Sequence, residues 1–366
     1  MKYLFILGRN PELSIAELRG IFGKFSFERS HNGNAILAEL PEDVIEKNFI
    51  ERLGGTIAIG RVLSEGEDLD SQLNAKMLYQ GTKNSISYVI WDFSSDEVYG
   101  RVKKYLKKRF REEKLRATEK QISGKMELQS GGTALYVPNR KLIDEQFFVF
   151  KDCFGRIVET CDYEEIERRD MGKPVRRESL AISPRLAKIM INLAQAKPGE
   201  TLLDPFCGVG VILQEALVQG IHAIGIDKDI SAINSARKNL RHFGMKDFEL
   251  ICGDSSKAKP GQVSAIVTEP DLGMVLKRAS PEGKARATLK RYEGLMTSVL
   301  NNLKKNVSGR IVFTGPYIML PNKKRIGCDI SNISSRTGLK PVQGFPVQEF
   351  RKNQIVGREI FVLEKS

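Results

Sequence analysis

The second half of the chain alternates short apolar segments with amphipathic ones, and this alternation limits the fold more than any other feature. Strands are predicted over residues 201–204, 223–226, 248–252, 263–268 and 310–314, with a last one over 355–363. Helices are predicted over 209–219 and 230–243, and over a longer segment whose apolar residues between Leu289 and Leu303 recur every three or four positions. Strands that alternate with helices form a parallel sheet with helices on both faces. We therefore predict an α/β, Rossmann-like domain over residues 183–366.

The first half has a different pattern, typical of an α+β fold. An alternating strand at residues 3–7 precedes a helix that begins at Asn10-Pro11, with Asn as its cap. Further strands are predicted over 85–91, 134–137 and 146–150, and a basic helix over 101–116. We divide this half into residues 1–60 and 61–165, and the charged segment 166–182 is predicted to be a linker.

The net charge of +13 is unevenly distributed along the chain. Residues 183–366 carry 28 basic and 16 acidic side chains, whereas residues 1–182 are nearly balanced, with 30 and 29. Within the first half, residues 101–125 hold eleven basic and three acidic side chains. Such clusters favour a polyanionic partner, with a merely solvated helix face as the alternative.

Several classes of protein are excluded by composition. No apolar run approaches the ~18 residues of a membrane span, so no membrane association is expected. The five cysteines are scattered without a CxxC pair, and the three histidines lie far from them and from one another. This argues against a disulfide framework and against a metal site, and it indicates a reducing, cytoplasmic location.

A glycine turn follows the first strand of the α/β domain. Gly208 and Gly210 permit a tight turn that lets the backbone approach a ligand closely. Asp227 ends the second strand, where a carboxylate can bind both ribose hydroxyls, and Asp254 follows the third, where an acid can reach an adenine amine. Polar groups at three successive strand ends predict a nucleoside-type cofactor. The residues assigned to this site are Asp204, Phe206, Cys207, Gly208, Gly210, Asp227, Lys228, Asp254 and Ser255.

These segments resemble class I S-adenosylmethionine-dependent methyltransferases. The resemblance is carried by DPFCGVG at 204–210, GID at 225–227, GDS at 253–255 and TEP at 268–270. It implies that S-adenosyl-L-methionine is the cofactor. The glycine turn would lie beside its methionine part, with Asp227 on the ribose and Asp254 on the adenine.

Three further segments resemble THUMP-domain-containing tRNA guanosine N2-methyltransferases, the group that acts at guanosine 10. They are YLFILGRNPELSIAEL at 3–18, FGRIVETCDYEEIERRDMGKP at 154–174 and SPRLAKIMINLA at 183–194. The resemblance implies a ferredoxin-like domain at 1–60 and a THUMP-like RNA-binding domain at 61–165, which together hold tRNA. It also implies methylation of the exocyclic N2 of a guanosine. DNA is not an expected partner, and a small activating protein stays open as one.

The segment after the fourth strand departs from the pattern of amino-group methyltransferases. Those enzymes have Asp or Asn, then Pro-Pro and an aromatic residue; the first side chain and a backbone carbonyl accept hydrogen bonds from the amine, and the ring stacks on the base. The corresponding positions here are Glu269, Pro270, Asp271 and Leu272. Glu269 still offers a hydrogen-bond acceptor, on a side chain one methylene longer than Asp. Leu272 has no ring, so part of a base-stacking contribution of ~1–3 kcal/mol is lost unless the ring of Phe206 or Tyr317 stacks on the base instead.

Basic residues near these segments are predicted to contact RNA phosphates, which would position tRNA without reading its sequence. They are Lys103, Lys104, Lys107, Lys108 and Arg111 in the basic helix, and Lys277 and Arg278 after the catalytic segment. The favoured function is an active tRNA methyltransferase. The alternatives are a tRNA-binding protein with a degenerate, inactive site, and a DNA amino-methyltransferase, which fits the fold but not the first half.

Overall fold

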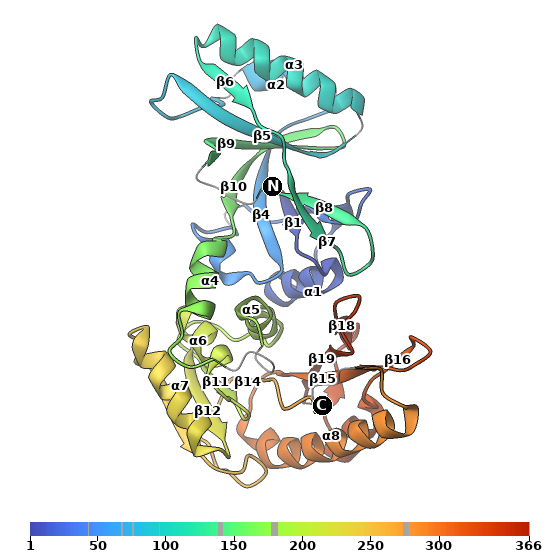
Figure 1. Cartoon of the computed structure of the whole chain (residues 1–366). Coiled ribbons are helices and arrows are strands. Elements are labelled where there is room, and N and C mark those ends of the chain that lie inside the picture. Colours follow the sequence, from blue (N-terminus) through green and yellow to red (C-terminus); the bar gives the residue numbers. More distant parts are fainter. Residues whose placement is uncertain are drawn as a thin grey trace. The chain divides into compact units, whose positions relative to one another are not determined.

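The computed structural model describes residues 1–42, 44–66, 69–74, 77–94, 96–137, 142–176, 182–273 and 278–365 (Figure 1). These residues form two compact units. Unit 1 comprises residues 1–14, 24–51 and 55–162, and unit 2 comprises residues 15–23, 52–54 and 163–366. Among the described helices, none combines the length and the apolar character needed to cross a membrane.

Unit 1 is built on one continuous sheet with the strand order β2-β3-β1-β4-β10-β9-β5-β6. Its elements, including the helices α1 and η1 that it shares with unit 2, are β1 (Lys2–Leu7), α1 (Pro11–Phe22), β2 (Phe27–Arg29), β3 (Ala35–Glu39), η1 (Phe49–Arg52), β4 (Thr56–Glu65), α2 (Leu69–Asn74), β5 (Ser85–Phe93), α3 (Asp96–Glu112), β6 (Arg116–Glu119), β9 (Glu145–Phe150) and β10 (Cys153–Thr160). A separate hairpin is formed by β7 (Gly124–Glu127) and β8 (Thr133–Tyr136). The predicted boundary between residues 60 and 61 falls inside β4, because β4 pairs with both β1 and β10.

Helix α3 is the basic helix predicted from the sequence. It ends at Glu112 rather than at Arg116, which begins β6 and pairs in parallel with β5. Its apolar residues Val102, Leu106 and Phe110 are buried in a core with Tyr88 and Phe147. The opposite side of α3 is therefore left to charged side chains.

Unit 2 contains the predicted α/β domain. Its elements are α4 (Tyr163–Met171), α5 (Pro184–Leu193), β11 (Thr201–Asp204), α6 (Val211–Val218), β12 (His222–Asp227), α7 (Ile230–His242), β13 (Phe248–Cys252), β14 (Ala265–Thr268), α8 (Glu282–Leu303), η3 (Lys304–Asn306), β15 (Ile311–Met319), β16 (Arg325–Ile326), α9 (Ile330–Thr337), β17 (Lys340–Pro341), β18 (Val347–Glu349) and β19 (Val356–Glu364). Helix α4 includes residues 166–171, the first six residues of the segment 166–182 that we expected to be a linker.

The sheet of unit 2 has the order β13-β12-β11-β14-β15-β19-β17. Strands β11 to β15 run parallel, but β19 pairs antiparallel with β15, so the sheet is mixed and not wholly parallel as predicted. Leu203, Ile224 and Ile266 share a core with α8. Since successive side chains of a strand alternate, Leu202 and its neighbours face the other side, where α6 contacts β11 and β12. Helices thus cover both faces, as predicted.

Candidate active site

Four parallel strands of unit 2 end at one edge of the sheet, and the predicted site residues follow them. Asp204 ends β11, Asp227 ends β12 and Thr268 ends β14. Asp204 is in register with Gly225, and Asp227 with Cys252 of β13. The carboxyl ends of parallel strands are the usual ligand site of such sheets.

The glycine turn and Asp227 are joined directly. Gly208 and Gly210 have φ angles of 51° and 89°, in the left-handed region that favours glycine. The backbone N–H of Gly208 donates to Oδ2 of Asp227 at 3.0 Å, and the N–H of Asp229 donates to Oδ1 at 2.9 Å. Apart from Gly208 itself and its two chain neighbours, no atom of the described residues lies within 4 Å of the position that a Cβ of Gly208 would take, so the turn has open space beside it. A half-buried carboxylate beside an open glycine turn fits the ribose of a nucleoside cofactor.

Cys207 lies inside this turn and packs against the neighbouring strand. It is 5% exposed, and a Cβ on Gly225 would lie 3.0 Å from its Sγ. Burial raises the pKa of the Cys207 thiol, which keeps it protonated. Cys207 is therefore a packing residue and not a nucleophile.

Asp204 is buried under the turn rather than presented at the surface. Its Oδ1 accepts hydrogen bonds from the Phe206 backbone at 3.1 Å and from the Thr268 hydroxyl at 2.6 Å. Burial raises the pKa of Asp204 to about 7. The two hydrogen bonds lower this pKa, whereas the nearby Asp227 and Glu269 carboxylates raise it further. This carboxyl group joins the glycine turn to the end of β14, where the catalytic segment begins.

The residues after β12 and β13 differ in exposure. Asp254 is exposed, and hydrogen bonds from the Ser256 hydroxyl and backbone lower its pKa. Ser255 is buried, and its hydroxyl donates to the carbonyl of Pro205. Lys228 is exposed. Of the acids that end or follow β11, β12 and β13, Asp227 and Asp254 are thus more accessible than the buried Asp204, which suits a ribose and an adenine amine.

In the catalytic segment, the four predicted residues have different surroundings. The Glu269 side chain is 7% exposed and is bound by Arg358 of β19. Pro270 is buried. Asp271 is exposed and accepts a hydrogen bond from the backbone of Gly273 at 2.9 Å, while Leu272 packs against the core below α8. Leu272 is thus partly buried against the core, at the position where the resemblance implies a base-stacking ring.

Arg358 is the contact of this site that the sequence does not reveal. It lies 89 positions after Glu269, and it reaches Glu269 only because β19 returns antiparallel beside β15, with Arg358 opposite Pro316. A pairing register of this kind has no local signature. A lone arginine in an apolar strand (VGREIFVL) is the one hint that the sequence contains.

The predicted RNA contacts lie in both units. In α3 of unit 1, Lys104, Lys107 and Arg111 are exposed, whereas Lys103 pairs with Glu119 at 3.0 Å and Lys108 with Glu112 at 3.8 Å. In unit 2, Arg278 is exposed, and Lys277 lies outside the described residues.

Two family models and a solved structure are similar to parts or all of this chain. Residues 174–320 match the family model of the RMKL-like methyltransferase domain, and residues 74–238 match a model described as DNA methylase. The structure of TrmN from Thermus thermophilus aligns over all of both chains with a TM-score of 0.47 and 18% identity.

The names of three similar proteins all describe the same activity. The tRNA (guanine(10)-N2)-dimethyltransferase of Methanothermobacter thermautotrophicus is 36% identical over 38% of this chain and 40% of its own length. The Pyrococcus abyssi protein of the same name is 36% identical over 31% of this chain and 33% of its own length. The tRNA (guanine(10)-N(2))-methyltransferase TRMT11 of Xenopus laevis is 23% identical over 75% of this chain and 64% of its own length. The chain thus spans less than half the length of the first two.

The sheet with helices on both faces, the glycine turn and the acids at successive strand ends define a Rossmann-like domain, as the sequence predicts, and most of this domain matches the methyltransferase family model. Within that class, the chain is similar to the tRNA guanine-N2 methyltransferases, and the predicted resemblance to that family is confirmed.

Proposed function

We propose that the protein is an S-adenosylmethionine-dependent tRNA methyltransferase that methylates the exocyclic N2 of a guanosine, with position 10 as the expected target. The observation that supports this most directly is the bond between Thr268 and Asp204, 2.6 Å long. It connects the segment that would hold an amine, Glu269-Pro270, to the glycine turn that would hold the cofactor. Donor and acceptor of a methyl group would therefore meet at one edge of the sheet.

The residues of this edge would act mainly by positioning. S-adenosylmethionine would supply the methyl group on a sulfonium sulfur. Glu269 and the backbone carbonyl of Pro270 would accept hydrogen bonds from the amine and orient its nitrogen lone pair. The amine loses one proton on methylation, and the Glu269 carboxylate is an acceptor within reach. Orientation of this kind supplies most of the acceleration of a simple displacement.

The tRNA substrate is supported by the names of the relatives and by the charge of α3. Lys104, Lys107 and Arg111 would contact phosphates, in line with the proposed ferredoxin-like and THUMP-like character of residues 1–165. A small activating protein and a cytoplasmic location stay predictions.

Methyl transfer itself tests the proposal. Unmodified tRNA is incubated with the protein and tritiated S-adenosylmethionine, and mass spectrometry of digested tRNA identifies the modified nucleoside. We expect N2-methylated guanosine with the wild type, at least about 100-fold less with Glu269→Ala, and wild-type levels with Glu282→Gln, an exposed acid on α8. Absence of label at high protein concentration, with cofactor binding confirmed, would refute the proposal. A preference for duplex DNA over tRNA in competition would instead indicate a DNA methyltransferase.

The second candidate is a tRNA-binding protein with an inactive site. Leu272 favours it, because an aliphatic side chain that is partly buried against the core occupies the position where the resemblance implies a base-stacking ring. It predicts tRNA affinity without turnover, and calorimetry that shows no binding of S-adenosylmethionine.

A further inference from the structure

Arg358 grips the carboxylate of Glu269 with two of its nitrogen atoms. Its Nε donates to Oε1 at 3.1 Å and to Oε2 at 2.9 Å, and its Nη2 donates to Oε1 at 2.7 Å. The side chains are only 20% and 7% exposed. A forked contact of this kind fixes the plane of the carboxylate as well as its position, because the guanidinium group is rigid and planar.

The contact with Arg358 leaves some lone pairs of the Glu269 carboxylate available to a substrate. A carboxylate has about four lone-pair positions, and it has no hydrogen to donate. Arg358 contacts Oε1 twice and Oε2 once. Acceptor capacity therefore remains mainly at Oε2, and the only polar character that Glu269 can offer a base is that of an acceptor.

A site that can only accept hydrogen bonds distinguishes between the nucleobases that carry an exocyclic amine. Guanine presents two donors side by side, N1–H and the N2 amine. Adenine and cytosine place a ring nitrogen that accepts hydrogen bonds next to their amine. A carboxylate held in one orientation accepts from both guanine donors but faces the lone pair of the other bases. Sites built for a hydrogen bond reject partners that cannot make it by large factors.

We propose that Arg358 is the positioning residue of this site: it locks Glu269 into the orientation that selects guanine by its adjacent N1–H and N2 amine. The inference rests on the proposed function, since it assumes that Glu269 receives the target amine. It adds the origin of the base preference, which lies in a residue on the last strand of the sheet.

The test uses two tRNA substrates that differ at the mapped target position. One carries guanosine and the other carries 2-aminopurine, which keeps the amine at C2 but has an acceptor at N1. We expect the wild type to prefer guanosine by roughly 10⁴-fold in kcat/KM. In Arg358→Met the value of kcat for guanosine should fall about 100-fold, as expected for a misplaced amine, while KM for tRNA stays near that of the wild type. The preference should drop below about 100-fold, because the carboxylate can turn away.

Arg310→Met is the matched control. Arg310 immediately precedes β15 and pairs with Glu364 of β19, with its Nε 3.6 Å from the carboxylate and a similar side-chain exposure of 23%, but it lies at the other end of the strand pair. This variant should keep both the rate and the preference. Arg358→Lys retains the charge without the fork, so its preference should lie between those of the wild type and of Arg358→Met.

The outcomes separate the two proposals. Wild-type protein that never methylates N2 refutes the proposed function. Wild-type protein that does methylate it, together with Arg358 variants that lose rate but keep the full preference for guanosine, overturns the inference alone. If Arg358→Met does not fold, Arg358→Lys and Glu269→Gln decide. The amide of Glu269→Gln can donate to N1 of 2-aminopurine, so an unchanged preference in both would overturn the inference.

Discussion

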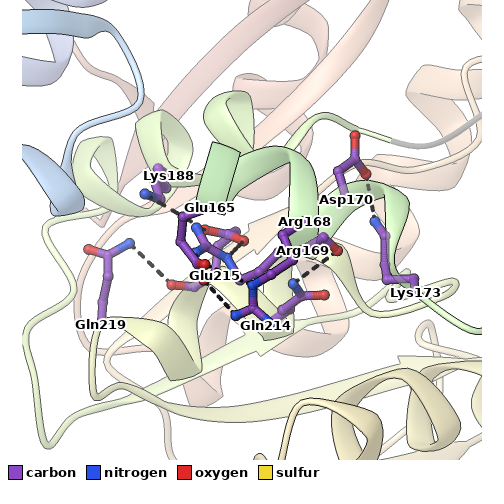
Figure 2. A network of polar contacts seen from close by, with 9 residues as sticks. All are labelled: Glu165, Arg168, Arg169, Asp170, Lys173, Lys188, Gln214, Glu215 and Gln219. Carbon is purple, nitrogen blue, oxygen red and sulfur yellow. Dashed lines mark hydrogen bonds and ion pairs between the residues drawn. The ribbon is translucent and has the colours of Figure 1, made fainter. Parts of the chain in front are cut away.

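A cluster of buried charges joins α4, α5 and α6, and it makes a sharp prediction about stability (Figure 2). Glu215 of α6 is fully buried, and Arg169 of α4 donates to both of its oxygens, at 3.1 and 3.2 Å. Lys188 of α5 lies 4.0 Å from the same carboxylate, and Glu165 accepts from Arg169 at 3.0 Å. We predict that Arg169→Met destabilises unit 2, because it removes both hydrogen bonds from Arg169 to the buried Glu215 carboxylate and leaves the more distant Lys188 beside it.

The expected magnitude follows from burial and from the remaining partner. Removing one member of a buried ion pair costs about 3–5 kcal/mol. Lys188 stays as a second buried cation, which places the expected loss near the lower limit, about 3 kcal/mol. For a unit of roughly 200 residues, this corresponds to a fall in Tm of about 6–12 °C.

The assay is urea unfolding followed by two probes. Trp91 is the sole tryptophan of the chain and lies buried in β5, so its fluorescence reports on unit 1. Far-ultraviolet circular dichroism reports on the helices of both units. We expect Arg169→Met to shift the dichroism transition of unit 2 and to leave the Trp91 transition in place.

Arg168→Met is the matched control, since Arg168 sits on the same helix and binds the same Glu165 but is 62% exposed. Its effect should stay within about 1 kcal/mol. Replacing Arg169, Glu215 and Lys188 together by Met, Leu and Met should recover most of the loss, because a buried charge cluster and an apolar one of similar volume have similar stability. Equal losses in Arg168→Met and Arg169→Met, or no recovery in the triple variant, would refute the reasoning.

Three further predictions concern the site and the RNA contacts. Asp227→Ala should weaken S-adenosylmethionine binding about 100-fold in calorimetry, through loss of charged hydrogen bonds to the ribose, and a smaller effect of Asp227→Ala than of Asp254→Ala would contradict the assignment. The pKa of Asp204 is raised from 3.8 to about 7, so the stability that its protonated form contributes is complete below about pH 3.8 and is lost as the pH rises to about 7. Asp204→Asn should therefore gain stability relative to the wild type, by up to about 1.4 kcal/mol per pH unit across that interval, and a difference independent of pH in urea titrations would count against it. Neutralising three exposed cations of α3 should lower the salt dependence of tRNA binding by about 2–3 in the logarithmic slope without a change in cofactor affinity; an unchanged slope would remove α3 from the RNA interface. These are Lys104, Lys107 and Arg111.

The fold of unit 2 could be predicted because its signals are local. The strands at 201–204 and 248–252 have the predicted bounds, and α7 ends one residue before its predicted end. The antiparallel course of β19 and the single sheet of unit 1 could not be predicted, since both depend on pairing between distant segments. Pairing of β4 with β10, about ninety residues apart, leaves no periodic pattern in either strand.

The candidate site shows the same division. The glycine turn, Asp227 and Glu269 stand in short segments whose residue types carry their chemistry, so they could be identified in the sequence. The partners of each carboxylate could not be predicted. Asp204 is bound by Thr268 of the adjoining strand β14, and Glu269 is bound by Arg358 of the last strand β19. Burial and partners, rather than residue type, decide which of these acids a ligand can reach.

The partners of each cation also decide what the net charge of the chain means for RNA binding. Residues 183–366 hold most of the net charge of +13, and three of their cations form ion pairs with carboxylates: Lys188 lies beside Glu215, Arg310 beside Glu364 and Arg358 on Glu269. A cation that already neutralises a carboxylate releases no counterion when RNA binds, so it adds nothing to the salt dependence. The α3 lysines differ in this respect, because Lys104 and Lys107 project into solvent from a helix whose apolar side is buried. Each of the three ion pairs removes one cation and one carboxylate, so the net charge of residues 183–366 is unchanged by them, and the exposed α3 lysines add further cations that RNA phosphates can reach.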